Sequence, residues 1–290
     1  MSTLKPAAVF SMPGGAPDWM VLTQDAVWVS DYPKNSVYRL DPATNRIAAT
    51  VDVGKGPCSG IAAGAGSVWV PVCGDGVLAR IDEHSQQVTA RLPFRPADSE
   101  GGIAFGDGSV WMLTDKTGVL SRIDPAKGQA IATIQVLPAS FACAFGEGAV
   151  WVTSTASNKL VRVDPQTNRV TRTVEVGAGP RFLTIGAGSV WTLNQGDGTI
   201  SRVDAGSSQL IASIAAGLVG TGGEIAYGEG AVWATLFQTP ITRIDPATNS
   251  VSAQWTGPGG DSIRAGFGSV WLTNLKQHNL WRLTTPLTIR

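Results

Sequence analysis

The sequence predicts an all-β fold, a seven-bladed β-propeller, on three observations: a tryptophan repeat, a recurrent glycine turn and strands of alternating polarity. The pair Val-Trp recurs at intervals of 38 to 42 residues. A period of about 40 residues made of strand-like units is typical of propeller blades. The repeated tryptophans are Trp28, Trp69, Trp111, Trp151, Trp191, Trp233 and Trp271.

Each repeat except the last contains four segments that predict antiparallel strands. The first is a short apolar run such as 101–106, which ends in a tight Gly-x-Gly turn in every repeat except the first. The second carries Val-Trp, and the third ends in Arg, an aliphatic residue and Asp. A turn of the type Asp-Pro-Ala-Thr-Asn, as at 41–45, leads to a fourth strand. This strand alternates in polarity over 46–53, so it is expected to be half-exposed.

The last repeat lacks a fourth strand, because little chain remains after Leu283. The N-terminal stretch 5–11 has the polarity of the missing strand. We therefore expect the N-terminal strand to complete the last blade and to close the ring, which removes the sheet edges at the seam. Residues 1–290 are then expected to form a single propeller domain.

The composition argues against several classes of partner. Lys plus Arg and Asp plus Glu both number 22, so the formal net charge is zero, whereas a nucleic-acid-binding protein needs a basic face. No apolar run reaches membrane-spanning length, and the N-terminus lacks the apolar stretch of a signal peptide. We expect a monomer that binds a small molecule and uses neither nucleic acid nor membrane nor an organic cofactor.

Two of the three cysteines are candidates for a disulfide. If Gly64 pairs with Ser67, counting outward places Cys58 opposite Cys73, with Cβ atoms within about 5.5 Å. In a two-residue hairpin this is a hydrogen-bonded pair, which is wider at the Cα atoms and less suited to a bridge, so both states stay open. A bridge favours a periplasmic or secreted protein over a cytoplasmic one. Cys143 is expected to be a small buried apolar residue.

Residues that recur in all blades are expected to maintain the fold. The Gly-x-Gly turns are not phosphate loops, because no helix follows them. The tryptophans are expected to pack between blades. One arginine per blade occupies an equivalent outer-strand position; such a ring could bind an anion, but repeated ion pairs or stems packed on tryptophan are expected instead. These arginines are Arg39, Arg80, Arg122, Arg162, Arg202, Arg243 and Arg282.

Positions at which the repeat breaks are expected to form the functional site. In a propeller the first strand of each blade lines the central channel, and the loops before it share one face with the loops after the second strand. At fixed offsets from the repeat tryptophans, acidic residues occur in blades six, seven and one, which are consecutive around the ring. We therefore expect an acidic arc at the channel mouth, consisting of Glu224, Asp261, Asp18 and Asp31.

Other side chains at these offsets complete the predicted pocket. Trp19 and Phe182 are expected to add an apolar wall. Arg181 is expected to hold a carboxylate or phosphate of the substrate. Asn194 and Asn274 are expected to orient substrate oxygens.

Clustered carboxylates suggest two kinds of chemistry. They bind a hard cation such as Mg²⁺ or Ca²⁺, or they raise the pKa of one carboxyl until it acts as a base or an acid. A polar channel without chemistry is the alternative. The predicted catalytic residues are Asp31, Asp261, Glu224 and Arg181. The predicted substrate contacts are Asp18, Trp19, Phe182, Asn194, Asn274 and Tyr32, and the predicted metal ligands are Asp18, Asp31 and Asp261.

The phrases DPATNRIAATVDVGKGP and GSVWV resemble the repeats of bacterial propellers of the streptogramin B lyase (virginiamycin B lyase) group and of YVTN-repeat proteins. The similarity covers all seven repeats. Streptogramin lyases open a cyclic depsipeptide by Mg²⁺-assisted elimination, which implies a pocket at the same mouth. The family's histidine positions fall on Gly223 and Asp261, and its glutamate position falls on Asn274. The resemblance therefore implies the fold and the pocket rather than streptogramin cleavage.

The expected function is that of a small-molecule lyase or hydrolase. It would break an ester-, lactone- or ether-like bond at the channel mouth, with or without a metal ion. The segments 91–100, which ends at Glu100, and 218–223 are expected to form lids over the pocket. The alternative is a propeller that binds a ligand or a protein without catalysis.

Overall fold

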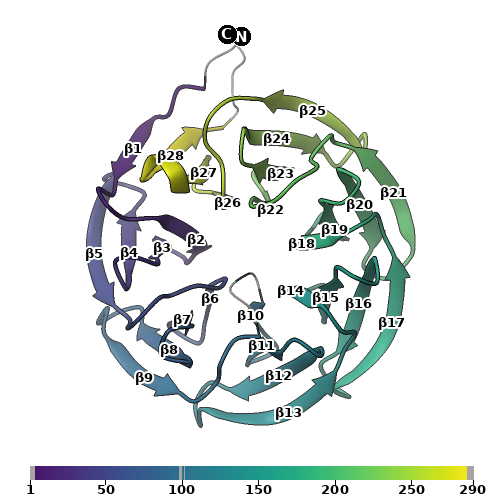
Figure 1. Ribbon diagram of the computed structural model, residues 1–290, viewed down its shortest axis with the longest axis horizontal. Coiled ribbons are helices and arrows are strands. Elements are labelled where there is room, and N and C mark those ends of the chain that lie inside the picture. Colours follow the sequence, from purple (N-terminus) through teal and green to yellow (C-terminus); the bar gives the residue numbers. More distant parts are fainter. Residues whose placement is uncertain (1–3, 98–99, 101, 286–290) are drawn as a thin grey trace.

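The computed structural model describes residues 4–97, 100 and 102–285, which form seven four-stranded antiparallel sheets around a central axis (Figure 1). Within blades one to six, the strand that comes first in the chain lies nearest the axis and the fourth lies at the rim. The described residues contain no α-helix, and none of them belongs to a helix long and apolar enough to cross a bilayer. The predicted all-β, seven-bladed propeller is confirmed.

The first four blades follow one another along the chain. Blade one consists of β2 (Pro17–Leu22), β3 (Val27–Asp31), β4 (Ser36–Asp41) and β5 (Arg46–Asp52). Blade two consists of β6 (Ala62–Gly64), β7 (Ser67–Val72), β8 (Val77–Asp82) and β9 (Val88–Leu92). Blade three consists of β10 (Ile103–Gly106), β11 (Ser109–Asp115), β12 (Val119–Asp124) and β13 (Gln129–Gln135). Blade four consists of β14 (Ser140–Gly146), β15 (Ala149–Ser154), β16 (Lys159–Asp164) and β17 (Arg169–Glu175).

The remaining blades bring the chain back to its start. Blade five consists of β18 (Pro180–Gly186), β19 (Ser189–Asn194), β20 (Thr199–Asp204) and β21 (Leu210–Ala215). Blade six consists of β22 (Glu224–Gly228), β23 (Ala231–Leu236), β24 (Thr239–Asp245) and β25 (Ser250–Trp255). Blade seven takes β26 (Ile263–Gly266), β27 (Ser269–Asn274) and β28 (Asn279–Thr284) from the end of the chain and β1 (Ala8–Ser11) from its beginning.

The N-terminal strand closes the ring, as the sequence predicts. β1 pairs antiparallel with β28, with Val9 opposite Trp281, and Figure 1 places the two strands side by side. A short 3-10 helix, η1 (Leu275–Gln277), connects β27 to β28. This pairing supplies the outer edge of blade seven and leaves no gap at the seam.

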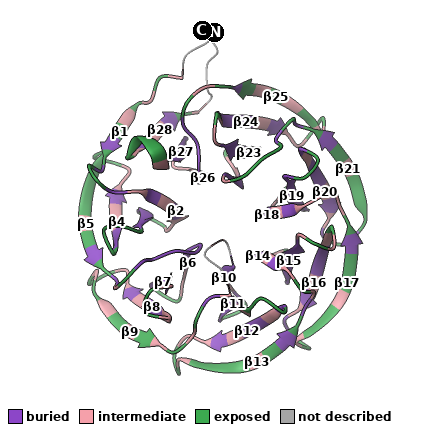
Figure 2. Cartoon of the chain, in the orientation of Figure 1, coloured by how far each residue is buried: buried purple, intermediate pink, exposed green. Residues whose placement is uncertain are grey.

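The repeat tryptophans pack between neighbouring blades, which confirms their predicted role. Trp69 of blade two, for example, belongs to one buried cluster with Ile103 and Met112 of blade three. In five blades the indole Nε1 donates to the carbonyl of the glycine that begins the Gly-x-Gly turn. The core therefore lies in the inner and middle strands, while the outermost strands are largely exposed (Figure 2).

The repeat arginines pack on these tryptophans. Each guanidinium group lies 4.7 to 6.0 Å from the ring centroid of the tryptophan in its own blade. In four blades the arginine also donates to the proline carbonyl in the outer turn of the next blade. The contact from Arg282 to Pro42 joins blade seven to blade one. The structure thus supports the structural reading of this ring over anion binding.

A disulfide joins Cys58 to Cys73, with their Cα atoms 5.8 Å apart. The register differs from the predicted one, because Pro57 rather than Cys58 is the residue that bridges to Val72 in the ladder. β6 contains only three residues, so the chain before it leaves the sheet and the simple outward count fails. Cys143 is buried, as predicted.

Candidate functional site

A cavity of about 530 Å³ opens at the channel mouth, on the face where first strands begin and second strands end. Its volume falls in the range of small-molecule sites, about 300–1,000 Å³. Blades one, two, three, five, six and seven all contribute to it. The wall consists of Ala16, Asp18, Trp19, Tyr32, Cys58, Glu100, Arg181, Thr221, Gly222, Gly223, Phe237, Asp261, Ser262 and Leu275.

Irregular strand pairing places several of these side chains. The β2–β3 ladder shifts register between Pro17 and Met20, as at a β-bulge, and the residues in between are Asp18 and Trp19. The β18–β19 ladder shifts in the same way around Arg181. Bulges commonly re-aim a side chain beside a functional site. Here they direct residues of the first strands toward the mouth.

Asp18 of blade one and Asp261 of the neighbouring blade seven form a hydrogen-bonded pair of carboxyl groups. Asp18 is partly exposed as a residue because it borders the cavity, but its carboxyl group is closely surrounded by protein. Desolvation of that group, and then the nearby charge of Asp261, raise its pKa well above the ordinary value. The opposite effects of their hydrogen bond on the two pKa values make Asp18 the donor and Asp261 the acceptor of the pair.

The carboxyl group of Asp261 has a pKa of about 6. Burial is the largest cause of this rise, while the hydrogen bonds from Asp18 and from the Gly223 N–H lower the pKa and limit the rise. The charges of Glu224 and Glu100 raise it further. A carboxyl with a pKa near neutrality is suited to proton transfer, because both of its protonation states are populated under working conditions.

Glu224 lies deeper, in a buried ion pair. Its Oε1 is 2.5 Å from Nη1 of Arg264, and its Oε2 accepts hydrogen bonds from the Ser262 hydroxyl and from the Ile263 N–H, the latter at 3.1 Å. These partners fix the carboxylate and compensate its charge. Glu224 thus contributes to the negative potential at the Asp18–Asp261 pair but is not placed among the residues that line the mouth cavity.

Arg181 lines the cavity but already has an anionic partner. Its Nη2 lies 2.5 Å from Oε2 of Glu100. Its guanidinium carbon lies 4.6 Å from the ring centroid of Phe141 and 5.5 Å from that of Phe182. We predicted that Arg181 binds an anionic group of the substrate. In the structure its guanidinium group is instead paired with Glu100 in the cavity wall.

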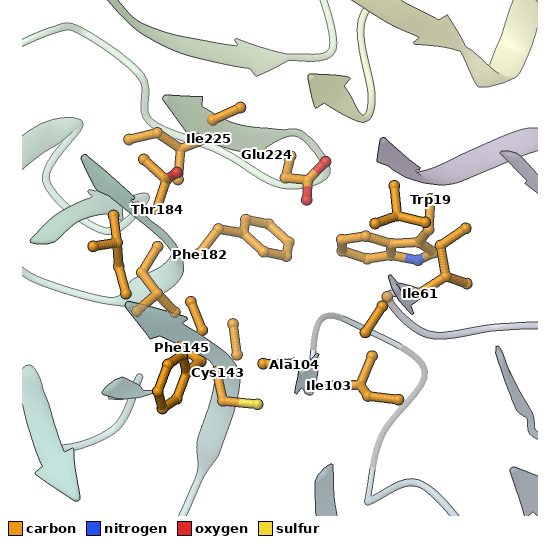
Figure 3. Close-up of a pocket in the computed structure, with 18 of the residues that line it drawn as sticks. Trp19, Ile61, Ile103, Ala104, Cys143, Phe145, Phe182, Thr184, Glu224 and Ile225 are labelled. Atoms are coloured by element: carbon orange, nitrogen blue, oxygen red, sulfur yellow. The ribbon is translucent and has the colours of Figure 1, made fainter. Parts of the chain in front are cut away.

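A second cavity, of about 340 Å³, lies along the axis and is lined mainly by apolar side chains. Figure 3 shows the rings of Trp19 and Phe182 facing each other across it, with the Glu224 carboxylate beside them. The two ring centroids are 5.7 Å apart. Trp19 borders both cavities, whereas Phe182 lines only the axial one.

Three predicted site residues form hydrogen bonds inside the protein rather than facing the cavity. The Asp31 carboxylate accepts hydrogen bonds from the backbone of Ala16 at 2.9 Å and of Lys34 at 3.3 Å. Asn194 donates to two hydroxyl groups of its own blade, and the Asn274 carbonyl oxygen accepts from the Gly260 N–H. All three side chains are fully buried at the end of a second strand and do not line the mouth cavity. The expectation that they face the substrate is corrected.

The predicted metal triad is not assembled. Asp31 lies away from the cavity, and Asp18 and Asp261 are engaged with each other through a proton. Within residues 4–97, 100 and 102–285, no group of three or more His, Cys, Asp or Glu side chains converges as metal ligands do. These residues do not fit a three-carboxylate Mg²⁺ or Ca²⁺ site, so no chemical step is assigned to a metal here.

Several lining residues were missed by the sequence analysis or were named only in passing. Glu100 forms an ion pair with Arg181, and Arg264 forms one with Glu224. Each pair joins two different blades, and aligning the repeats does not show which residues of different blades meet. Ser262 lies at the same distance before its repeat tryptophan as Trp19 and Glu224, but it was not among the predicted site residues. Phe237 follows a second strand, and its aromatic character in a polar loop was an available signal. The segment 91–100 includes positions 98–99, which lie outside the described residues, so its role as a lid stays a prediction.

Comparisons with known proteins support the fold. No family model matches the chain, and no curated protein matches it. A streptogramin B lyase structure superposes with a TM-score of 0.78 at 18% sequence identity, covering 93% of each chain. Virginiamycin B lyase from Staphylococcus aureus has a TM-score of 0.78 at 16% identity, covering 96% of this chain and 98% of that one. Hydrazine synthase from Kuenenia stuttgartiensis has a TM-score of 0.79 at 11% identity, covering 97% and 98%. At these identities the likeness establishes a shared propeller fold, as the resemblance of the repeats implies.

Proposed function

We propose that this protein is an enzyme that breaks a C–O bond of a small organic molecule in the mouth cavity, by elimination or by hydrolysis. The observation that carries the proposal is the hydrogen-bonded pair of Asp18 and Asp261 at the wall of a cavity of small-molecule size. Paired carboxyl groups in different protonation states supply a base and an acid side by side. The shared fold with a lyase is consistent with this chemistry but does not specify it.

In this proposal Asp261 acts as the base and Asp18 as the acid. In an elimination, the ionised Asp261 takes a proton from a carbon next to a carbonyl group, and the C–H electrons form the new double bond. The C–O bond breaks, and the leaving oxygen takes the proton of Asp18. In a hydrolysis, Asp261 instead takes a proton from a water molecule that attacks the carbonyl carbon. Proton transfer between the two hydrogen-bonded carboxyls then restores the starting state.

A set of esters, lactones and β-alkoxy carbonyl compounds, assayed for turnover, tests the proposal. The wild-type protein is expected to convert at least one class, and Asp261→Asn is expected to reduce kcat by about 10²–10⁴-fold while the variant remains folded. Glu175→Gln is the matched control, because Glu175 is an exposed carboxylate on the outer strand β17. Equal rates for Asp261→Asn and Glu175→Gln would remove the Asp18–Asp261 pair from the reaction.

The alternative, a propeller that binds its ligand without catalysis, is favoured by one observation. Two of the charged side chains predicted to be catalytic, Glu224 and Arg181, are already paired with Arg264 and Glu100. A ligand that binds wild type and Asp261→Asn with similar affinity, and that neither converts, would support this alternative.

A further inference from the structure

The charges that line the mouth cavity are unbalanced. Its charged side chains are three carboxyl groups and one guanidinium group. Glu100 and Arg181 neutralise each other, which leaves Asp18 and Asp261 with one negative charge when they share a proton. Among the described residues, no basic side chain forms an ion pair with either of them, and Arg264 is engaged with Glu224.

The apolar part of the wall is suited to a cation as well as to an uncharged group. Tyr32, Trp19 and Phe237 all line the cavity, and Tyr32 is 55% exposed. The face of an aromatic ring attracts ammonium groups. Nζ of Lys276 already lies 4.2 Å from the centroid of the Phe237 ring, which leaves Tyr32 and Trp19 as the aromatic side chains available to a ligand. Aromatic side chains beside a carboxylate form an arrangement that suits an organic ammonium ion.

We propose that the ligand of the mouth cavity is an organic cation that carries an ammonium group. The ammonium group would lie against the aromatic side chains beside Asp18 and Asp261. This inference rests on the proposed function because it uses the same cavity, and it narrows the substrate class to amino esters and related compounds. It replaces the anionic substrate that Arg181 had suggested.

Two ligands of nearly equal shape test directly whether a positive charge on the ligand strengthens binding. Acetylcholine carries a quaternary ammonium group, and 3,3-dimethylbutyl acetate is its uncharged carbon isostere. Binding is measured by calorimetry and by the rise in Tm at pH 8, where Asp261 is ionised. Acetylcholine is expected to bind at least about tenfold more tightly. Equal affinity, tighter binding of the isostere, or no binding of either probe at millimolar concentration would overturn the inference.

Variants show whether the preference for the cation comes from the cavity or from the overall charge of the protein surface. Asp261→Asn and Tyr32→Leu are each expected to reduce the preference for acetylcholine by about threefold or more, whereas Glu175→Gln is expected to preserve it. Tyr32 is exposed, so its replacement is not expected to unfold the protein. Equal preference in wild type and both cavity variants would overturn the inference.

Turnover distinguishes a failure of this inference from a failure of the proposed function. If acetylcholine binds preferentially but neither ester nor any elimination substrate is converted, the cation site stands and the enzymatic proposal fails. If the uncharged ester is converted as well as the cationic one, the enzymatic proposal stands and the cation inference fails.

Discussion

The carboxyl groups of Asp18 and Asp261 are hydrogen-bonded to each other between the first and last blades of the ring. Asp18 belongs to the innermost strand of blade one, and Asp261 lies two residues before the innermost strand of blade seven. The candidate site is therefore built from residues near opposite ends of the chain, which the ring of blades brings together.

The free energy of unfolding should respond to removal of this pair in a pH-dependent way. The pKa of Asp261 is about 6 in the folded protein against an ordinary value of 3.8, so the folded state binds the proton more tightly. Stability is therefore lost as pH rises through this window. Asp261→Asn removes that loss and is expected to be more stable than wild type by about 1–3 kcal/mol at pH 8, but not at pH 4. Urea unfolding at both pH values measures the difference, and a variant less stable than wild type at pH 8 would argue against the shift.

The pH dependence of catalysis follows from the same groups. The base Asp261 must be ionised, so kcat/KM is expected to rise with pH through an apparent pKa of about 6. The acid Asp18 must stay protonated, and its pKa is raised well above its ordinary value, so activity is expected to fall again at the pH at which Asp18 loses its proton. Asp18→Asn should abolish the upper limb of the profile. A profile that is flat between pH 5 and pH 9 would contradict these assignments.

The buried ion pair beneath the mouth should be strongly coupled. Glu224→Gln leaves Arg264 without its carboxylate, which is expected to cost about 2–4 kcal/mol, with an allowance for the partial exposure of Arg264. Arg264→Met likewise leaves the buried Glu224 carboxylate without its cationic partner. The double variant should be less destabilised than the sum of the two single variants. Strict additivity in a double-mutant cycle would show that the pair does not interact in solution.

The arginine at the seam should matter more than an equivalent arginine elsewhere. Arg282 stacks on Trp271 and also donates to Pro42 and, at 2.7 Å, to Asn45 of blade one. Arg243 stacks on Trp233, and its Nη1 donates to Ser252 of the same blade rather than to the next blade. Arg282→Met is therefore expected to lower the free energy of unfolding by about 1–3 kcal/mol more than Arg243→Met. Equal losses would mean that the cross-seam bonds contribute nothing.

The fold was largely predictable because its signals repeat. The tryptophan in each second strand has one role, and its periodic spacing is a direct consequence of stacking equivalent blades. The closing strand was also predictable, because a blade without a fourth strand leaves an open edge. The Cys58–Cys73 register was not, because the pairing shifts between Ala62, which faces Trp69, and Pro57, which faces Val72, and nothing in the sequence marks that shift.

The candidate site was predictable only in part. Asp18 and Asp261 stand out because they break the repeat next to each other in the ring. Asp31 and Asn274 break it too, but they end second strands that are buried on both faces, so their polar groups must be satisfied inside the blade. Arg181 reaches the mouth through a register shift that single-sequence patterns do not reveal.

The ¹³C NMR titration of the aspartate side-chain carboxyls tests the central claim most directly. The signals of Asp18 and Asp261 are assigned by their disappearance in Asp18→Asn and Asp261→Asn. One carboxyl is expected to titrate near pH 6 and the other also well above the ordinary aspartate value, and each substitution should shift the remaining titration. Two independent titrations near the ordinary aspartate value of 3.8 would contradict a shared proton and the reactive centre built on it.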